Sequence, residues 1–317
     1  MLAAGLGTRL RPLTSIRAKA AVPVNGEALA HRVIRWLVSQ GATDLVVNLH
    51  HHPQTIAREV GDGLDLGARV RYSWEDPVLG SAGGPRHALP LLGPIFLLVN
   101  GDTLTDVDVT AMLAAHLAAK ALVTMALIRN PRPEKYGGVQ LSGDGCVTGF
   151  TRAGTAAESF HFIGVQIAEA EVFASLEDGV PAETVNRLYP RLIAERRQRI
   201  LGFVSEASFK DIGTPRDYLE TSAELAQIEG DRLSDGARVV RSPSARLVRT
   251  AVWDDVVIGR DVELADCVVC DGVRLPDGAR YERCAIVPVT TAEGVTLVPD
   301  SAAGDRIEGG LLIRPIR

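Results

Sequence analysis

The sequence predicts an α/β fold for about the first 228 residues and a parallel β-helix for the remainder. Up to about residue 228, short β-branched runs alternate with segments of helical periodicity, as a mostly parallel sheet covered by helices requires. Beyond that point the helical periodicity disappears, and aliphatic residues recur every six positions. A chain of 317 residues is long enough for two such domains.

The first half of the chain supplies the helices and strands of the predicted sheet. A helix is expected around residues 29–37, where apolar residues share one face and Gly41 stands in the position of a C-terminal cap. Asp44–Asn48 has the pattern of a strand. Ile95–Val99 is apolar without alternation, which suits a strand buried on both faces at the centre of a sheet. A further helix and strand are expected at residues 109–119 and 122–128.

An antiparallel insert is expected after this alternating half. The turn residues Asp144–Gly145 between two strand-like runs predict a β-hairpin, and Phe160–Ile167 predicts another strand. Thr214, followed by Pro215 and Asp217, has the N-cap chemistry of a helix that runs to about residue 228. The predicted domains are therefore residues 1–228 and 229–317.

The prediction of a β-helix depends on hexapeptide-like spacing in the second domain. Repeats of this length stack short strands into coils, with one aliphatic side chain of each face pointing inward. A small β-sandwich is the alternative. Two series of residues show the spacing: Val252, Ile258 and Leu264, and Val256, Val262 and Val268.

Composition excludes several classes of protein. The 34 Lys and Arg against 39 Asp and Glu give a net charge of -5 that is spread along the chain, which argues against a nucleic-acid partner. The longest apolar stretch, Leu89–Val99, is shorter than the roughly 20 residues of a membrane-spanning helix, so no membrane partner is expected. Because the first residues lack the charge order of a secretory signal, a cytoplasmic location is expected.

The four cysteines are too few for a disulfide framework in a chain of this length, and reduced thiols are expected. Cys267 and Cys270 have the spacing of a zinc-binding pair, with Cys284 nearby. No second pair accompanies them, so burial inside the β-helix is favoured over a zinc site.

The first candidate functional segment is the glycine-rich run at residues 2–13. Its backbone N–H groups can form an anion nest for a triphosphate, and Arg9 adds a bidentate charged fork. The run departs from a dinucleotide-binding fingerprint, because Leu10 stands where the third glycine belongs, and it lacks the Gly-Lys-Ser/Thr ending of a P-loop. The alternative is a tight turn with a surface arginine.

Four further segments along the chain carry residues whose chemistry suits phosphate or metal binding. Together with the first run, they resemble the motifs of the sugar-1-phosphate nucleotidylyltransferases, and the resemblance covers about residues 1–228. It implies a Rossmann-like nucleotidyltransferase fold with a mixed sheet and a magnesium-dependent active site. These segments are Lys19 before Ala20–Val24, the small-residue loop Gly80–Gly84, Asp102 after the apolar strand, and Asp211 before a helix.

The chain is most similar to two groups within this family. Mannose-1-phosphate guanylyltransferases share a Gly-Thr-Ala-Gly loop, here Gly80–Gly83, and often have a C-terminal left-handed β-helix. N-acetylmuramate-1-phosphate uridylyltransferases generally lack that domain. The tail therefore favours mannose 1-phosphate and GTP as substrates, with uridylyl transfer to another hexose 1-phosphate as the alternative.

The chemistry of this reaction sets what the residues must do. A sugar phosphate oxygen attacks the α-phosphorus in line and expels pyrophosphate, and a phosphate monoester is already largely dianionic because its second pKa is about 6. Repulsion between anions is then the main barrier. We expect Arg9 and Lys19 to neutralise the phosphates, and Asp102 and Asp211 to hold Mg²⁺.

Each of these residues also has a purely structural interpretation. Asp102 could simply form a turn, Lys19 could be a solvated loop residue, and Asp211 could favour the start of a helix. The combination of all four favours catalysis. The resemblance further assigns nucleotide binding to Leu2, Ala3, Ala4, Gly5, Gly7, Thr8, Arg9, Glu75, Gly80, Ser81 and Gly83.

For the sugar, the resemblance points to Tyr136, Gly137, His161 and Gly164. Many relatives carry Glu-Lys-Pro after the preceding strand, where this chain has Thr-Arg-Ala, so Arg152 is expected to replace the lysine as a phosphate contact. A second departure is that only one residue precedes the Leu-Ala-Ala-Gly run, which predicts a shortened first strand.

These two departures motivate a second hypothesis, a nucleotide-sugar-binding regulatory subunit without transferase activity. Acyl transfer by the tail is a weaker third, because residues 236–317 contain no histidine to act as a base. A β-helix exposes flat coils at its ends, so a homo-oligomer formed through the tail is expected.

Overall fold

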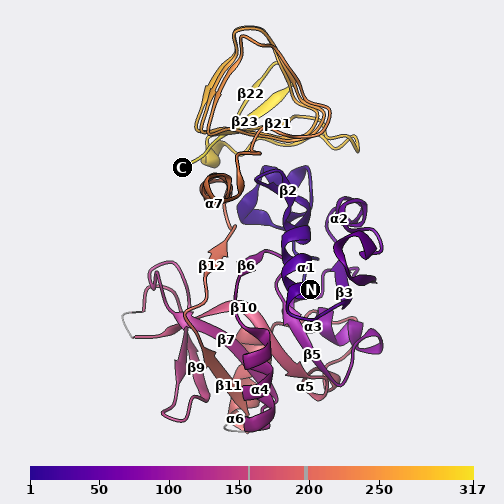
Figure 1. The fold of residues 1–317 in the computed structure, drawn as a ribbon, viewed down its shortest axis with the longest axis vertical. Helices are drawn as coiled ribbons and strands as arrows, with labels where there is room; N and C mark the ends of the chain where they lie inside the picture. The colour runs from indigo at the N-terminus through magenta and orange to yellow at the C-terminus, as the bar shows by residue number, and fades with distance from the viewer. Residues whose placement is uncertain (156–157, 196–198) are drawn as a thin grey trace. The chain divides into compact units, whose positions relative to one another are not determined.

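The computed structural model describes residues 1–155, 158–195 and 199–317 (Figure 1). These residues form two compact units, each made of several segments. The predicted boundary after residue 228 stays a prediction. The first unit consists of Met1–Gly5, Arg32–Pro53 and Val60–Lys210, and the second of Leu6–His31, Gln54–Glu59 and Asp211–Arg317.

A six-stranded mixed sheet organises the first unit. Strand β10 pairs antiparallel with β5, β7 and β8, β7 pairs parallel with β11, and β8 and β9 form the predicted hairpin. A separate parallel pair joins β3 and β4. The layout is thus more antiparallel than the expected mostly parallel sheet. The strands are β3 (Asp44–Leu49), β4 (Arg69–Trp74), β5 (Ile95–Val99), β6 (Thr103–Thr105), β7 (Val123–Arg129), β8 (Gly138–Leu141), β9 (Val147–Thr151), β10 (Phe160–Glu169) and β11 (Ile200–Val204).

The apolar strand β5 lies where predicted, but it is fully buried on both faces only at its C-terminal end. Leu98 and Val99, whose side chains point to opposite faces, are buried there, whereas Ile95 at the other end is exposed. Its ladder partner among the described residues is β10. The strand expected before the glycine-rich run is reduced to a single parallel bridge between Leu2 and Asn100.

Helices α3, α4, α5 and α6 contact strands of the first unit. Helix α1 begins in the second unit and continues into the first after His31, and most of α2 belongs to the second unit. Buried side chains of the sheet and helices, among them Met125, Leu127, Phe173 and Tyr189, form the core of the first unit. Asp108 caps α4 by accepting a hydrogen bond from the Ala111 N–H group at 2.9 Å. The helices are α1 (Leu29–Ser39), α2 (Pro53–Val60), α3 (Gly80–Ala88), α4 (Val109–Ala119), α5 (Glu171–Ala174) and α6 (Tyr189–Glu195).

The second unit begins with the part of the chain that carries Arg9 and Lys19. Three short 3₁₀ turns lead into a hairpin of β1 and β2. The predicted helix α7 (Pro215–Glu229) forms behind Thr214, whose hydroxyl accepts a hydrogen bond from the Asp217 N–H group at 3.1 Å. The bounds of the short elements are η1 (Thr8–Leu10), η2 (Leu13–Ser15), η3 (Lys19–Ala21), β1 (Pro23–Val24), β2 (Glu27–Ala28) and β12 (Phe209–Asp211), which starts in the first unit.

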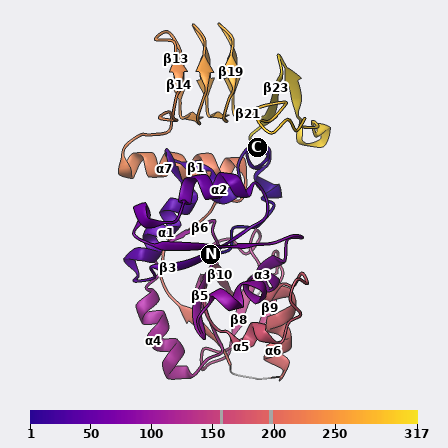
Figure 2. The same ribbon diagram turned by 90° about the vertical axis from the view of Figure 1, so that its right-hand side faces the viewer.

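After α7 the chain winds into a parallel β-helix, as predicted. Its coils are three-sided in Figure 1, and in Figure 2 the strands of successive coils stand side by side. Equivalent positions lie 17 residues apart, one fewer than three hexads give. The strands are β13 (Val240–Arg241), β14 (Arg246–Val248), β15 (Ala251–Val252), β16 (Val257–Ile258), β17 (Glu263–Ala265), β18 (Val268–Val269), β19 (Arg274–Leu275), β20 (Arg280–Glu282) and β21 (Cys284–Pro288).

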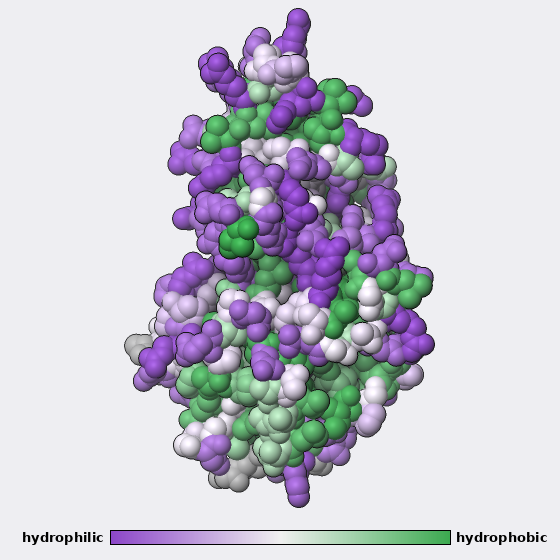
Figure 3. All heavy atoms as spheres, viewed as in Figure 1, coloured by the Kyte–Doolittle hydropathy of each residue, from purple (hydrophilic) through white to green (hydrophobic). Residues whose placement is uncertain are grey.

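The interior of the β-helix is aliphatic. It contains the residues that predicted the repeat, including Val252, Ile258 and Leu264. Three cysteines, Cys267, Cys270 and Cys284, are buried free thiols, in agreement with the sequence. On the side viewed in Figure 3, hydrophilic residues alternate with smaller apolar patches over the β-helix.

One edge of the last coil is covered. Strand β23 (Leu311–Pro315) pairs antiparallel with β21, and β22 (Arg306–Glu308) pairs with β23. Covering an edge strand in this way removes a row of unpaired backbone groups from solvent. Among the described residues, no helix is long and apolar enough to cross a membrane.

Candidate active site

The predicted phosphate-binding run is divided between the two units after Gly5. In the first unit, the N–H groups of Ala3 and Ala4 donate to Oδ1 of Asn48, at 2.5 and 3.2 Å. These two amides therefore hold the loop to β3. In the second unit Gly7 has a left-handed φ of 59°, and a Cβ added to it would come within 2.7 Å of Thr14.

Asn48 and Glu75 form a buried brace under this run. The Glu75 carboxylate accepts from Nδ2 of Asn48 at 2.6 Å and from the Leu79 N–H group at 2.7 Å. Glu75 is fully buried, so its carboxylate serves the brace. The sequence predicted Glu75 as a nucleotide contact, but it did not predict a role for Asn48. The position of Asn48 near the buried end of β3 is the sequence signal that could have indicated that role.

The small residues of Gly80–Gly84 predicted a loop, but in the structure this segment is the start of helix α3. The Ser81 hydroxyl donates to Glu183 at 2.6 Å and accepts from the Thr184 N–H group at 2.9 Å. A Cβ on Gly83 would lie 2.7 Å from the Val180 carbonyl oxygen. The small residues thus let a distant part of the first unit pack against this helix.

Asp102 follows β5 in a turn that the first unit holds closely. The Asn100 N–H group donates to the Gly164 carbonyl at 2.8 Å, and Gly101 N–H donates to Leu2 carbonyl at 2.8 Å. Gly164 has a φ of 78°, and a Cβ there would lie 2.7 Å from Asn100 and Thr103 side-chain atoms. A side chain at residue 164 would therefore displace the turn that carries Asp102.

Arg9 and Asp211 come together in the second unit. The Arg9 guanidinium lies 3.8 Å from the Asp211 carboxylate. The Arg9 side chain is 64% exposed and that of Asp211 is 14% exposed. Such a pair leaves guanidinium donors free to point toward solvent, where an anion can reach them. Lys19 belongs to the same unit, in turn η3.

Three of the five predicted sugar-binding residues line a cavity of about 550 Å³ in the first unit. Gly137, Arg152 and His161 all line it. Tyr136 stacks on His161 with ring centroids 4.4 Å apart, and the Phe209 ring lies 4.9 Å from His161. Phe209 was not predicted, although it stands two residues before Asp211.

Two cations accompany this aromatic cluster. The Arg132 guanidinium carbon and the Lys135 ammonium lie 5.7 and 5.2 Å from the centroid of Tyr136. Arg152 lines the cavity itself, whereas Arg132 and Lys135 contact Tyr136, the residue that precedes the lining residue Gly137. Gly164, which was also predicted to bind sugar, packs against the Asp102 turn instead of lining this cavity.

A family model described as Nucleotidyl transferase matches residues 1–228, which include every predicted site residue. The chain belongs to the nucleotidyl transferase family. The resemblance seen in the sequence is thereby confirmed, and the chain is an enzyme of the sugar-1-phosphate nucleotidylyltransferase class.

Relatives of this nucleotidyl transferase have several specificities. A mannose-1-phosphate guanylyltransferase from Mycobacterium tuberculosis is 29% identical over 89% of this chain and 82% of its own. An N-acetylmuramate alpha-1-phosphate uridylyltransferase from Neisseria meningitidis is 36% identical over 68% of this chain and 92% of its own. The crystal structure of HddC from Yersinia pseudotuberculosis complexed with GMP-PN is 22% identical, covers 71% of this chain and 97% of that one, and shares the fold with a TM-score of 0.62.

Magnesium is the metal that the family implies, and the donor set of this nucleotidyl transferase fits it. Mg²⁺ prefers hard oxygen ligands and is usually held by one or two carboxylates, waters and substrate phosphates. Asp102 and Asp211 offer such oxygens. Within the described residues, no cluster of three or more His, Cys, Asp or Glu forms a complete protein cage. Asp102 belongs to the first unit and Asp211 to the second, and the carboxylate of either residue suits an ion that arrives with a nucleotide.

Proposed function

We propose that this enzyme joins mannose 1-phosphate to the guanylyl group of GTP and releases pyrophosphate. The observation that supports this choice is the similarity to the mannose-1-phosphate guanylyltransferase over 89% of the chain, which reaches into the β-helix. A UTP–glucose-1-phosphate uridylyltransferase from Synechocystis spans 91% of the chain at a lower identity, 24% against 29%.

The proposed chemistry needs cations and positioning more than proton transfer. The attacking phosphate oxygen is already ionised at neutral pH, so no general base is required. Arg9 and Lys19 neutralise the phosphates as the two anions approach each other. Because Arg9 is balanced by Asp211 in the free enzyme, its guanidinium is held near the carboxylate before the triphosphate binds.

Asp102 and Asp211 would hold the metal. When bound, Mg²⁺ neutralises phosphate oxygens and so favours attack on the α-phosphorus. Asp102 is kept in place by the turn that Gly164 packs against, and Asp211 by its position at the end of β12. We assign both carboxylates this role from their chemistry and from the family motifs.

The sugar phosphate is proposed to occupy the cavity lined by Arg152 and His161. Aromatic side chains and the guanidinium of Arg152 suit a hexose ring that carries a phosphate. We assign Arg152 the role of the lysine of the missing Glu-Lys-Pro motif, because it lines this cavity. Its planar guanidinium can bind phosphate oxygens in a bidentate manner.

A matrix of substrates tests the proposal. Purified enzyme with Mg²⁺ is combined with GTP, UTP, ATP, CTP or dTTP and with mannose, glucose or N-acetylmuramate 1-phosphate, and pyrophosphate release is measured. The highest kcat/KM is expected for GTP with mannose 1-phosphate. A maximum for another pair contradicts the assigned substrates. If no substrate pair releases pyrophosphate although the protein still binds a nucleotide sugar, the transferase activity itself is contradicted.

Uridylyl transfer is the second candidate. The Neisseria relative is 36% identical over 219 aligned residues, whereas the guanylyltransferase is 29% identical over 297. The UTP wells of the same matrix decide between the two bases.

A further inference from the structure

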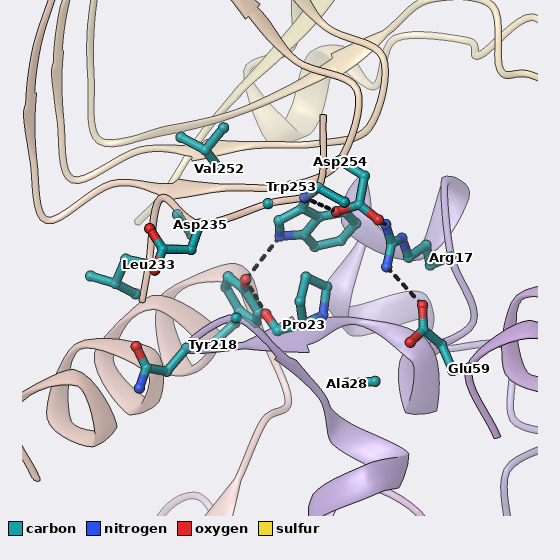
Figure 4. A pocket seen from close by; sticks show the side chains of 15 residues that line it. Arg17, Pro23, Ala28, Glu59, Tyr218, Leu233, Asp235, Val252, Trp253 and Asp254 are labelled. Carbon is teal, nitrogen blue, oxygen red and sulfur yellow. Dashed lines mark hydrogen bonds and ion pairs between the residues drawn. The ribbon is translucent and has the colours of Figure 1, made fainter. Parts of the chain in front are cut away.

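The segment that carries Lys19 is anchored by the β-helix at its N-terminal end. Arg17 is only 8% exposed, although it is charged. Its Nε and Nη2 atoms donate to the two carboxylate oxygens of Asp271 at 2.6 and 2.8 Å. Nη2 also donates to Asp254 at 2.6 Å, and Figure 4 shows Arg17 beside Asp254. Glu59 accepts from Nη1 at 3.3 Å. The guanidinium is therefore fixed from several directions.

The carboxylates that hold Arg17 are themselves fixed. Asp254 and Asp271 occupy equivalent positions in consecutive coils, and the Asp254 N–H group donates to Oδ1 of Asp271 at 3.0 Å. Burial alone lowers the pKa of Arg17, but the hydrogen bonds and charges of both aspartates outweigh burial and raise that pKa above its usual range. Removing the arginine would leave these carboxylates without their shared cation.

A second anchor lies at the other end of the segment. The indole Nε1–H of Trp253 donates to the Tyr218 hydroxyl at 2.9 Å, which in turn donates to the Pro23 carbonyl at 2.5 Å (Figure 4). Both rings are 1% exposed. Burial raises the pKa of Tyr218, so its hydroxyl keeps the proton that it donates. The Arg17 guanidinium lies 5.5 Å from the ring centroid of Trp253, so the indole of the second anchor also contacts the first.

Between the anchors, backbone bonds fix the short turn that carries Lys19. The Ala18 N–H group donates to the Thr55 hydroxyl at 3.0 Å, and Ala21 N–H donates to the Ala18 carbonyl at 2.8 Å. A lysine has a flexible four-carbon stem, so the placement of its ammonium depends on how well its backbone is held. A misplaced cation loses much of its effect on a reaction between anions.

We propose that the first coils of the β-helix act in catalysis by positioning Lys19, through Arg17 at one end of residues 17–23 and through Trp253 and Tyr218 at the other. These are positioning residues, since they act through Lys19. The inference rests on the proposed function for the role of Lys19. The anchoring itself does not depend on that function.

Arg17→Gln tests the first anchor against a matched control, Arg260→Gln. Arg260 also pairs with an aspartate one coil away, with Nε 2.9 Å from Asp277, but both side chains are exposed and the pair is remote in sequence from residues 17–23. Without substrates, hydrogen exchange of a peptide covering residues 17–24 is expected to quicken at least tenfold in Arg17→Gln and to stay at the wild-type rate in Arg260→Gln. Wild-type exchange in a folded Arg17→Gln protein overturns the proposal.

Tyr218→Phe tests the second anchor with a smaller change, because it removes only the hydroxyl. Faster exchange confined to the same peptide is expected, while the circular dichroism of the whole protein is retained. If Arg17→Gln fails to fold, this variant decides the proposal alone, and unchanged exchange in it overturns the second anchor.

A double-mutant cycle tests whether the anchors act through Lys19. With active substrates, kcat/KM is expected to fall at least tenfold in Arg17→Gln, but to change less than twofold when Arg17→Gln is added to Lys19→Ala, because the positioned cation is already gone. Independent losses that multiply overturn the positioning role. If the wild type turns over no substrate pair, the proposed function fails, and the exchange measurements still test the anchoring.

Discussion

At the scale of residues, Arg9 and Asp211 are brought together from positions 202 apart in the sequence. Their pairing at 3.8 Å could be inferred only from the family motifs, because nothing local in either segment indicates the other. The guanidinium is mostly exposed and the carboxylate mostly buried. Such an arrangement balances the carboxylate in the free enzyme and leaves the cation accessible.

Asp211→Asn is expected to lower kcat by about 100-fold, the usual effect of removing one preorganised electrostatic contact. The amide cannot supply the anionic oxygen that a divalent ion requires, and it no longer balances Arg9. Pyrophosphate release at saturating substrates measures the loss. Asp261→Asn, an exposed aspartate in a turn of the β-helix, is the control and should keep wild-type kcat. Equal kcat in both variants would contradict the role of Asp211.

His116 gives the first unit a dependence on pH. It is 1% exposed, its Nδ1 lies 2.8 Å from the Thr124 hydroxyl, and burial lowers its pKa below 6.5 although nearby Glu169 opposes this. As the pH falls through 6.5, His116 therefore takes up a proton in the unfolded chain before it does so in the folded chain. The free energy of unfolding falls below that pH as a result.

Urea unfolding at pH 7.5 and 5.5 measures this effect. The free energy of unfolding should fall more in the wild type than in His116→Gln, which has no imidazole to protonate. The comparison of the two proteins removes the contribution of carboxylates that they share. Parallel declines in both would show that another group is responsible.

At the scale of elements, the helices and strands with regular patterns were predicted well, and the departures have nonlocal causes. Residues 80–84 have poor helix propensity and predict a loop. They form the first turn of α3 because the Ala82 and Gly83 N–H groups both donate to the Ala182 carbonyl, about 100 residues away. No property of the segment itself indicates that partner.

Strand β5 shows the converse. Its uninterrupted apolar sequence is typical of a strand with neighbours on both sides. Among the residues that the structure describes, β10 forms the ladder on one side, and the other side has the single bridge of Leu2 to Asn100. Pairing is decided by the rest of the sheet, and the hydrophobic pattern of one strand does not specify it.

The packing of α3 against the Asn48–Glu75 brace leads to a further prediction. A Cβ on Gly84 would overlap Oε1 of Glu75 and lie 2.9 Å from Nδ2 of Asn48. Gly84→Ala should therefore lower the free energy of unfolding by about 1–3 kcal/mol, as overpacking of a core does. It should also raise the KM for the nucleotide, because Asn48 holds the Ala3–Ala4 amides.

Gly143→Ala is the matched control for this variant. A Cβ at residue 143 meets nothing within 4 Å, and the residue does not have a left-handed φ. Urea unfolding and nucleotide titration of both variants give the comparison. Wild-type stability in Gly84→Ala would mean that the brace can shift without cost.

At the scale of the whole molecule, the C-terminal domain has two expected roles. The sequence predicted an oligomer through exposed coil ends. The structure covers one edge of the last coil with β23, while the edges at β19 and β20 carry the charged residues Arg274, Arg280 and Glu282. The proposed anchoring of residues 17–23 gives the same domain a role within each chain.

A chain ending at Ile228 separates the consequences of losing the tail. It is expected to be a monomer by size-exclusion chromatography with light scattering, and to lose kcat/KM because Trp253, Asp254 and Asp271 are absent. Full-length Arg17→Gln should lose activity but keep its oligomeric state. A shortened chain of unchanged mass refutes assembly through the tail. One with unchanged kcat/KM refutes its catalytic role.

The 17-residue coil also limits how the tail can vary in length. Asp254 and Asp271 both reach Arg17 because they belong to adjacent coils, and neighbouring strands lie about 4.8 Å apart. An extra coil inserted between them would carry one carboxylate beyond the guanidinium. An extra coil added after both would leave them undisturbed. The β-helix can therefore gain or lose whole coils only after Asp271, while the coils that carry Asp254 and Asp271 must stay adjacent.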